Sequence, residues 1–181
     1  MKQQYPRPTV GALTFKRKKE NLDGMITCYF EKKKKAYLRH VTVDALLVKK
    51  NKILLIKRAS HLIEGNKYAL PGGFLDRDET TAEGVLREVK EETGYEGKII
   101  SLFRINDNPD RKREKRQNVV FVYLVQAKRK VAKFDKEVTK IKWFSLDKLP
   151  KPEEIAFDHY ENIELYRQYR KEKFSLPIIK L

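Results

Sequence analysis

The stretch from Gly73 to Tyr95 constrains the fold of this chain more than any other part of the sequence. Thr80 and Glu83 have the spacing of a capping box, in which two side chains satisfy backbone N–H groups at the start of a helix. Gly94 suits the left-handed conformation that ends many helices. Apolar residues recur between these positions at helical spacing: Ala82, Val85, Leu86 and Val89. The sequence therefore predicts a helix that packs one face on a core.

A second face of this predicted helix carries Glu88, Glu91 and Glu92. Glu91 and Glu92 fall in the last turn, where the helix dipole favours cations. Like charges at this spacing also repel by about 0.2–0.5 kcal/mol per pair. A solvated face of mixed charges is the alternative interpretation of such a run. Because the arrangement is poor for stability, it favours a bound divalent cation, and the oxygen ligands indicate Mg²⁺ or Mn²⁺.

The order of residues in this stretch resembles the Nudix box, the signature of the Nudix hydrolases. The defining positions are filled by Gly73, Glu79, Arg87, Glu88, Val89, Glu91, Glu92, Gly94 and Tyr95. The resemblance covers about residues 41–166. It implies an α/β fold, a Nudix-type α/β/α sandwich with a mixed central sheet. It also implies metal-dependent hydrolysis of the pyrophosphate bond in a nucleoside diphosphate linked to another moiety.

The same resemblance implies a role for each residue of the box. The expected metal ligands are Gly73, through its carbonyl, Glu88, Glu91 and Glu92. The three glutamates are also expected to be catalytic, with Mg²⁺ as the cofactor and Mn²⁺ as the alternative. Glu79 and Arg87 are expected to brace the box by an ion pair, and Gly94 to end its helix.

The general base does not carry over cleanly, because relatives use either a box glutamate or an acid from another loop. Glu137, Glu114 and Asp110 are the candidates outside the box. Glu137 is preferred as a fourth catalytic residue because it precedes the strand that contains Trp143, where relatives often carry an acid.

Basic residues outside the box are the expected contacts of the substrate. Arg58 ends an apolar strand that aims toward the box in the family, although a surface charge is the alternative. Arg111 and Arg113 lie in the polar segment 106–117, which is expected to be a flexible loop without core residues. Pro109 in this loop resembles the ADP-ribose pyrophosphatase branch, although a turn proline explains it as well.

The expected reaction is therefore hydrolysis of ADP-ribose to AMP and ribose 5-phosphate. Other pyrophosphate substrates stay open: a nucleoside triphosphate, a dinucleotide or capped RNA. An alternative of a different class is a non-catalytic sensor of an ADP-ribose-type ligand. The complete acidic face of the box argues against this sensor.

The charge balance indicates polyanionic partners. The 181 residues carry a formal net charge of +16, and residues 1–39 hold 11 Lys and Arg against 3 Asp and Glu. This surplus exceeds what a small diphosphate site needs, so RNA is a candidate partner besides the nucleotide substrate. A generally lysine-rich composition is the alternative explanation.

Short apolar runs and turn signals suggest how the rest of the chain is organised. Strands are expected at residues 9–15, 25–30, 41–48, 52–58, 67–70, 98–105, 118–127 and 141–144. The first two are expected to form a hairpin. Residues 145–150 resemble a short helix of the family, and Pro152 is expected to start the last helix.

Three regions follow from these patterns: a basic, strand-rich N-terminal arm at residues 1–39, a Nudix hydrolase domain at 40–172 and a C-terminal tail at 173–181. Free strand edges make the arm a candidate interface for a homodimer. No apolar run reaches the length of a membrane span, and no secretory signal is apparent, so no membrane association is expected. The single cysteine, Cys28, favours a cytoplasmic location.

Overall fold

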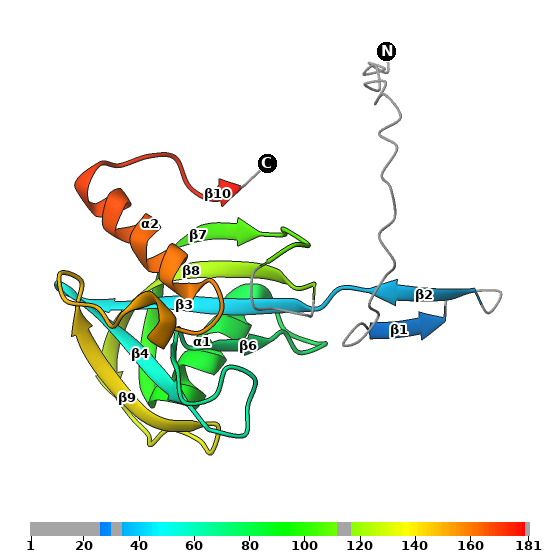
Figure 1. Cartoon of the computed structure of the whole chain (residues 1–181), viewed down its shortest axis with the longest axis horizontal. Coiled ribbons are helices and arrows are strands. Elements are labelled where there is room, and N and C mark those ends of the chain that lie inside the picture. Colours follow the sequence, from blue (N-terminus) through cyan, green and yellow to red (C-terminus); the bar gives the residue numbers. More distant parts are fainter. Residues whose placement is uncertain (1–25, 30–33, 112–116, 180–181) are drawn as a thin grey trace, which may run out of the picture.

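The computed structural model describes residues 26–29, 34–111 and 117–179 (Figure 1). Its strands are β1 (Ile26–Tyr29), β2 (Lys35–Leu38), β3 (Val41–Lys49), β4 (Lys52–Arg58), β5 (Tyr68–Ala69), β6 (Gly72–Phe74), β7 (Tyr95–Asn106), β8 (Val119–Lys130), β9 (Val138–Ser145) and β10 (Ile178–Ile179). Its helices are α1 (Thr81–Thr93), the 3₁₀ turn η2 (Pro152–Glu154) and α2 (His159–Lys171). The predicted strand at 9–15 lies outside the described residues.

The main sheet is mixed, as the resemblance to the Nudix hydrolases implied. Its strands follow the order β10-β7-β8-β3-β4-β5, with β6 added beside β3 and β9 beside β4. The pairs β3–β8 and β7–β10 are parallel, whereas β3–β4, β3–β6, β4–β5, β4–β9 and β7–β8 are antiparallel. Strand β3 therefore joins the long β7–β8 pair to the short strand β6, which leads toward α1.

Two helices cover the opposite faces of this sheet. Alternate side chains of β3 point to opposite faces, as in any strand. Val43 belongs to the apolar cluster that includes Val85 and Val89 of α1. Leu46 belongs to a second cluster, which includes Ile163 and Tyr166 of α2. The layers are thus α1, sheet and α2, which confirms the expected α/β/α sandwich (Figure 1).

The helix α1 begins and ends as its sequence predicts. The Thr80 hydroxyl accepts a hydrogen bond from the Glu83 N–H, and the Glu83 carboxylate accepts one from the Thr80 N–H, which completes the capping box. Gly94 ends the helix in the left-handed region with φ of 73°. Val85 and Val89 are fully buried, so the predicted apolar stripe faces the core.

The segment between β9 and α2 differs from the prediction. Residues 145–150 form a turn, with a bridge between Ser145 and Lys148, in place of the expected short helix. Pro152 starts only the 3₁₀ turn η2, and α2 begins at His159. The reason is a competing contact, because the N–H of Ala156 donates to the Tyr68 carbonyl at 2.8 Å and keeps this stretch extended. Ala156 is therefore buried in an extended stretch and does not belong to the predicted helix.

Both ends of the described chain also depart from the expected pairing. Strand β1 pairs with β2, which begins at Lys35 and was not among the predicted strands. Figure 1 shows this hairpin extending away from the main sheet. At the other end, the predicted tail contributes β10, whose Ile178 pairs with Arg104 of β7. No helix among the described residues is long and apolar enough to cross a membrane.

Candidate active site

The strand β6 brings two glycines against the acidic face of α1. The N–H of Gly72 donates to Oε2 of Glu92 at 2.8 Å. A Cβ atom on Gly73 would lie 2.4 Å from Oε1 of Glu88, so no larger residue fits there without displacing that carboxylate. The box therefore folds back on itself, with Glu88 and Glu92 directed at the turn that precedes the helix.

Arg87 holds the acidic residues of the box in place. Its Nε and Nη2 donate to both carboxylate oxygens of Glu79 at 3.0 and 2.6 Å. Its Nη1 donates to Glu88 at 2.8 Å and to Glu91 at 3.1 Å. Nη2 also donates to the carbonyl of Phe74 in β6 at 3.1 Å. One guanidinium thus joins the loop, the strand and the helix, and the ion pair expected between Glu79 and Arg87 is present.

The carboxylates of the box lie in different electrostatic environments. Hydrogen bonds from Arg87 and from the Asp76 N–H lower the pKa of Glu79 from 4.5 to about 2. Burial raises the pKa of Glu88, although the Arg87 hydrogen bond opposes this shift. Burial also raises the pKa of Glu92 well above its ordinary value, and the Glu88 charge adds to the effect. Glu88 and Glu92 therefore form an acidic pair that a cation would stabilise.

Oxygen donors and burial make this pair suitable for a hard divalent cation. Glu92 is only 4% exposed, and Gly73 leaves open the space that a Cβ would fill beside Glu88. Across residues 26–29, 34–111 and 117–179, no three His, Cys, Asp or Glu side chains converge closely enough to hold a metal as they stand. Glu91, the third predicted ligand, is half exposed and turned toward Arg87.

The candidates for the general base lie at different distances from the box. Glu137 is exposed at the start of β9, and its charge lies close enough to Glu88 to contribute to that residue's raised pKa. Asp110 is exposed in the loop after β7, where its N–H donates to Asn108 Oδ1 at 3.0 Å. Glu114 lies outside the described residues. The structure therefore brings Glu137 toward the acidic pair.

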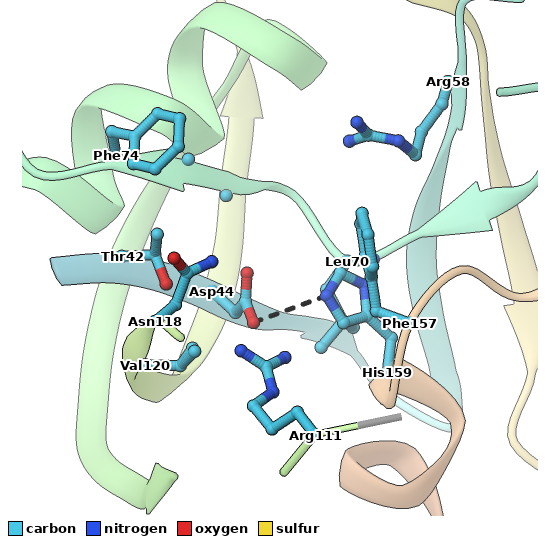
Figure 2. A pocket seen from close by; sticks show the side chains of 12 residues that line it. Thr42, Asp44, Arg58, Leu70, Phe74, Arg111, Asn118, Val120, Phe157 and His159 are labelled. Atoms are coloured by element: carbon cyan, nitrogen blue, oxygen red, sulfur yellow. Dashed lines mark hydrogen bonds and ion pairs between the residues drawn. The ribbon is translucent and has the colours of Figure 1, made fainter. Parts of the chain in front are cut away.

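A polar cavity of about 110 Å³ lies on the other side of β6, toward α2 (Figure 2). Gly72 and Gly73 line it, so the two glycines separate the cavity from the acidic pair on α1. Its polar side chains are Thr42, Asp44, Arg58, Arg111, Asn118 and His159. The Oδ1 atom of Asn118 is buried without a hydrogen-bond partner within the part of the chain that the structure describes.

Asp44 and His159 form a buried acid–imidazole pair in the cavity wall (Figure 2). The N–H of Leu70 donates to Nδ1 of His159 at 2.9 Å, so Nδ1 carries no proton. The proton of a neutral imidazole is then on Nε2, which lies 3.5 Å from Oδ2 of Asp44. Burial raises the pKa of Asp44, and the positive groups around it act in the opposite direction.

The expected substrate contacts Arg58 and Arg111 both line this cavity, while Arg113 lies outside the described residues. The guanidinium of Arg58 lies 5.2 Å from the centre of the Phe157 ring. Arg111 forms a buried ion pair with Asp158, with Nη2 and Oδ1 2.5 Å apart. Burial acts to raise the pKa of Asp158, but the hydrogen bonds and charge of Arg111 outweigh it and lower this pKa.

The loop after β7 is therefore less detached than its sequence suggested. Asn106 ends β7 and is only 2% exposed, and its Nδ2 donates to Asp158 Oδ2 at 2.6 Å. Arg111 is bound to the same carboxylate. No residue of this segment that the structure describes joins the apolar core, as predicted, but Asp158 draws the side chains of Asn106 and Arg111 inward from a distant part of the sequence.

Several cavity residues were not identified from the sequence. Asp44 is the single charged residue in the buried run Thr42–Val48, which is a recognisable signal of function. Asp158 immediately precedes α2 and His159 begins it, and neither was assigned to the site from the sequence. His159 is buried, at 5% exposure, and lines the cavity. Asn118 carries no comparable signal.

Several known proteins are similar to this chain. The model of the NUDIX domain family matches residues 38–166. An ADP-ribose pyrophosphatase from Methanocaldococcus jannaschii is 39% identical over 141 residues, which is 77% of this chain and 80% of that protein. An 8-oxo-dGDP phosphatase from Homo sapiens is 30% identical over 137 residues, which is 74% of this chain and 40% of that protein.

A solved structure also shares the fold. The NUDIX hydrolase from Nitrosomonas europaea superposes with a TM-score of 0.69 and 21% sequence identity. The match covers 86% of this chain and 92% of that one. At this level of identity the likeness concerns the fold alone.

The Glu79–Arg87 ion pair should make the free energy of unfolding depend on pH, and the substitution Glu79→Gln should reduce this dependence. Because the pKa of Glu79 falls from 4.5 to about 2 on folding, its ionised form stabilises the fold above pH 4.5, and this contribution is lost as the pH falls toward 2. Glutamine can still accept hydrogen bonds, so the variant removes mainly the charge. Urea unfolding of the wild type and the variant between about pH 7 and about pH 2.5 measures the difference in their free energies of unfolding. A difference independent of pH would contradict the assignment.

Proposed function

The chain belongs to the Nudix hydrolase family, and from this premise we propose that it hydrolyses ADP-ribose to AMP and ribose 5-phosphate. More generally, its substrate would be a nucleoside diphosphate linked to another moiety. The observation that carries the proposal is the position of Gly72 and Gly73 between the Glu88–Glu92 pair and a polar cavity. The relative from Methanocaldococcus jannaschii, an ADP-ribose pyrophosphatase of which the match covers 80%, supports the choice of substrate.

Glu88, Glu92 and the Gly73 carbonyl are the groups that would hold Mg²⁺, with Mn²⁺ as the alternative. Glu91, whose side chain is half exposed, would join them by leaving Arg87, to which it is bound through Nη1. A divalent cation in such a site supplies positive charge that offsets the charge of a pyrophosphate. Arg87 keeps Glu88 oriented toward β6 and so preserves the ligand geometry.

The cavity supports recognition of one part of the substrate. Its volume of about 110 Å³ is well below the roughly 300–1,000 Å³ typical of a whole drug-sized ligand, so it suits a single ring. Asp44 and Asn118 offer polar contacts in its wall, while Arg58 and Arg111 supply positive charge. A nucleotide bound there would pass its pyrophosphate over Gly73 toward Glu88.

In this arrangement Glu137 acts as the general base. A carboxylate oxygen of Glu137 takes a proton from the water whose oxygen attacks one phosphorus of the pyrophosphate. The bond from that phosphorus to the bridging oxygen breaks, and the bridging oxygen leaves with the other phosphate. For ADP-ribose this step yields AMP and ribose 5-phosphate. Exposure of Glu137 allows water to reach it.

The alternatives differ in the part of the substrate beyond the pyrophosphate. A nucleoside triphosphate, a dinucleotide and capped RNA all present the same bond, and the net charge of +16 favours an RNA substrate or partner. A non-catalytic sensor is less well supported, because a ligand sensor has no need of the Glu88–Glu92 pair and the cost of burying Glu92. The cytoplasmic location expected from Cys28 stays a prediction.

A second copy of this chain is the proposed partner of the N-terminal hairpin. Strands β1 and β2 form a separate two-stranded sheet, and such a hairpin is at best marginally stable alone in water. Ile26 and Leu38, which pair across it, are 40% and 42% exposed. Apolar contact with another hairpin would cover them.

A substrate panel tests the proposed reaction. With Mg²⁺ present, we expect ADP-ribose to be hydrolysed with the highest kcat/KM among ADP-ribose, NADH, 8-oxo-dGDP, nucleoside triphosphates and capped RNA. Mass spectrometry should identify AMP and ribose 5-phosphate, with one oxygen from ¹⁸O-labelled water in a product phosphate. A preference for a triphosphate or for capped RNA would transfer the assignment to that substrate, and hydrolysis of none would contradict it.

The substitution Glu92→Gln should separate activity from stability. We expect kcat to fall by more than about 100-fold, because even changes beyond the ligands of a metal cost about 10–100-fold. In the absence of divalent ions the variant should be at least as stable as the wild type, because it removes an acidic group from a residue that is only 4% exposed. Steady-state kinetics and urea unfolding measure the two effects, with the exposed Glu153→Gln as the matched control. Full activity of Glu92→Gln at saturating Mg²⁺ would exclude Glu92 as a ligand.

The combined substitution Ile26→Lys and Leu38→Lys tests the partner of the hairpin. Two lysines at paired positions repel and remove the apolar contact, so a dimer should shift toward the monomer by at least about tenfold in Kd. Light scattering over a concentration series measures this shift on the full chain. A wild-type chain that is monomeric throughout, or a variant that dimerises equally well, would contradict the proposal.

A further inference from the structure

We propose that Asp135 is a positioning residue, whose side chain holds Glu137 beside the acidic face of α1. The inference rests on the proposed function, in which Glu137 accepts the proton of the attacking water. Asp135 itself would not touch the substrate. Its effect would pass through one hydrogen bond, from the N–H of Glu137 to Oδ1 of Asp135, which is 3.0 Å long.

The segment that carries Asp135 is attached to the C-terminal end of α1. The carbonyls in the last turn of a helix have no partner within that helix. The N–H of Asp135 donates to one of them, the carbonyl of Glu91, at 3.0 Å. The N–H of Val131 donates to the Gly94 carbonyl at 2.8 Å. Asp135 is therefore placed by the same helix that presents the acidic pair.

Glu137 is held on both sides of its backbone. Its N–H bonds the Asp135 side chain two residues earlier, which is the geometry of an Asx turn. Its carbonyl accepts the N–H of Ala59, just beyond β4, at 2.9 Å. The next residue, Val138, is 4% exposed and begins β9. The exposed carboxylate of Glu137 thus stands on a backbone fixed between α1 and β4.

The hydrogen bond and the charge of Asp135 have opposite consequences. The hydrogen bond orders the turn, whereas the charge of Asp135 contributes to the raised pKa of the nearby Glu92. Asparagine keeps an oxygen that can accept from Glu137 and removes the charge. Alanine removes both. A comparison of the two variants therefore identifies which property of Asp135 matters.

A double-mutant cycle tests whether Asp135 acts through Glu137. We expect Asp135→Ala to lower kcat about ten- to a hundredfold, the effect of a small misplacement of a reacting group. Asp135→Asn should recover most of that loss. In a Glu137→Gln background, Asp135→Ala should change kcat less than about twofold, because the group that it positions is already gone. Lys136→Ala, in the same turn, is the matched control and should leave kcat unchanged.

Amide hydrogen exchange supplies a readout that does not depend on activity. The Glu137 N–H should exchange at least about tenfold faster in Asp135→Ala than in the wild type or in Asp135→Asn, while the amides of α1 stay protected. An equal loss of kcat from Asp135→Ala in both backgrounds would overturn the inference, as would full activity of Glu137→Gln. If no nucleotide is hydrolysed, the proposed function fails, and unchanged exchange at Glu137 would separately overturn the positioning role.

Discussion

The fold and the site both depend on the close approach of carboxylates to the glycine pair in β6. Gly72 has no side chain, which leaves room for the Asp44 carboxylate on one side of the strand. On the other side, the Gly72 N–H donates to Glu92. A Cβ on Gly72 would lie 2.5 Å from Oδ1 of Asp44, and one on Gly73 would lie 2.4 Å from Oε1 of Glu88. Two residues without side chains therefore let acidic groups from β3 and α1 meet at one short strand. The acidic pair and the cavity are neighbours for this reason, although they lie on opposite faces of the sheet.

This arrangement carries a cost in stability that other contacts offset. Burial raises the pKa of Asp44, Glu88 and Glu92, so each of these carboxylates is less stable ionised in the folded chain than in water. Arg87 offsets part of the cost at the box, where it bonds three carboxylates and one carbonyl. The apolar clusters around Val85 and Val89 on one face of the sheet and around Ile163 on the other stabilise the fold and offset the rest of this cost. Several carboxylates that destabilise the fold within one small region are typical of a site that is selected for function.

The sequence predicted the parts of the structure that local interactions determine. The capping box at Thr80 and the left-handed Gly94 are contacts within a few residues, so the bounds of α1 could be read from the chain. The cavity depends on contacts between distant residues: Leu70 with His159 across 89 positions, and Arg111 with Asp158 across 47. No local pattern encodes such pairs. The start of α2 was missed for a related reason, because Ala156 is held extended by Tyr68, which lies far earlier in the sequence.

The division between the two faces of β6 suggests how reaction and specificity can vary independently. The acidic pair is built from a single continuous stretch, so its geometry is set once α1 and β6 have formed. The cavity takes Asp44 from β3, Arg58 from β4 and Arg111 from the loop after β7, so each of its walls belongs to a different element. A change in one wall alters the shape offered to the substrate and leaves the Arg87 contacts in place. Among the residues that the structure describes, Gly72 and Gly73 face both, so a side chain at either position would disturb the cavity and the acidic pair together.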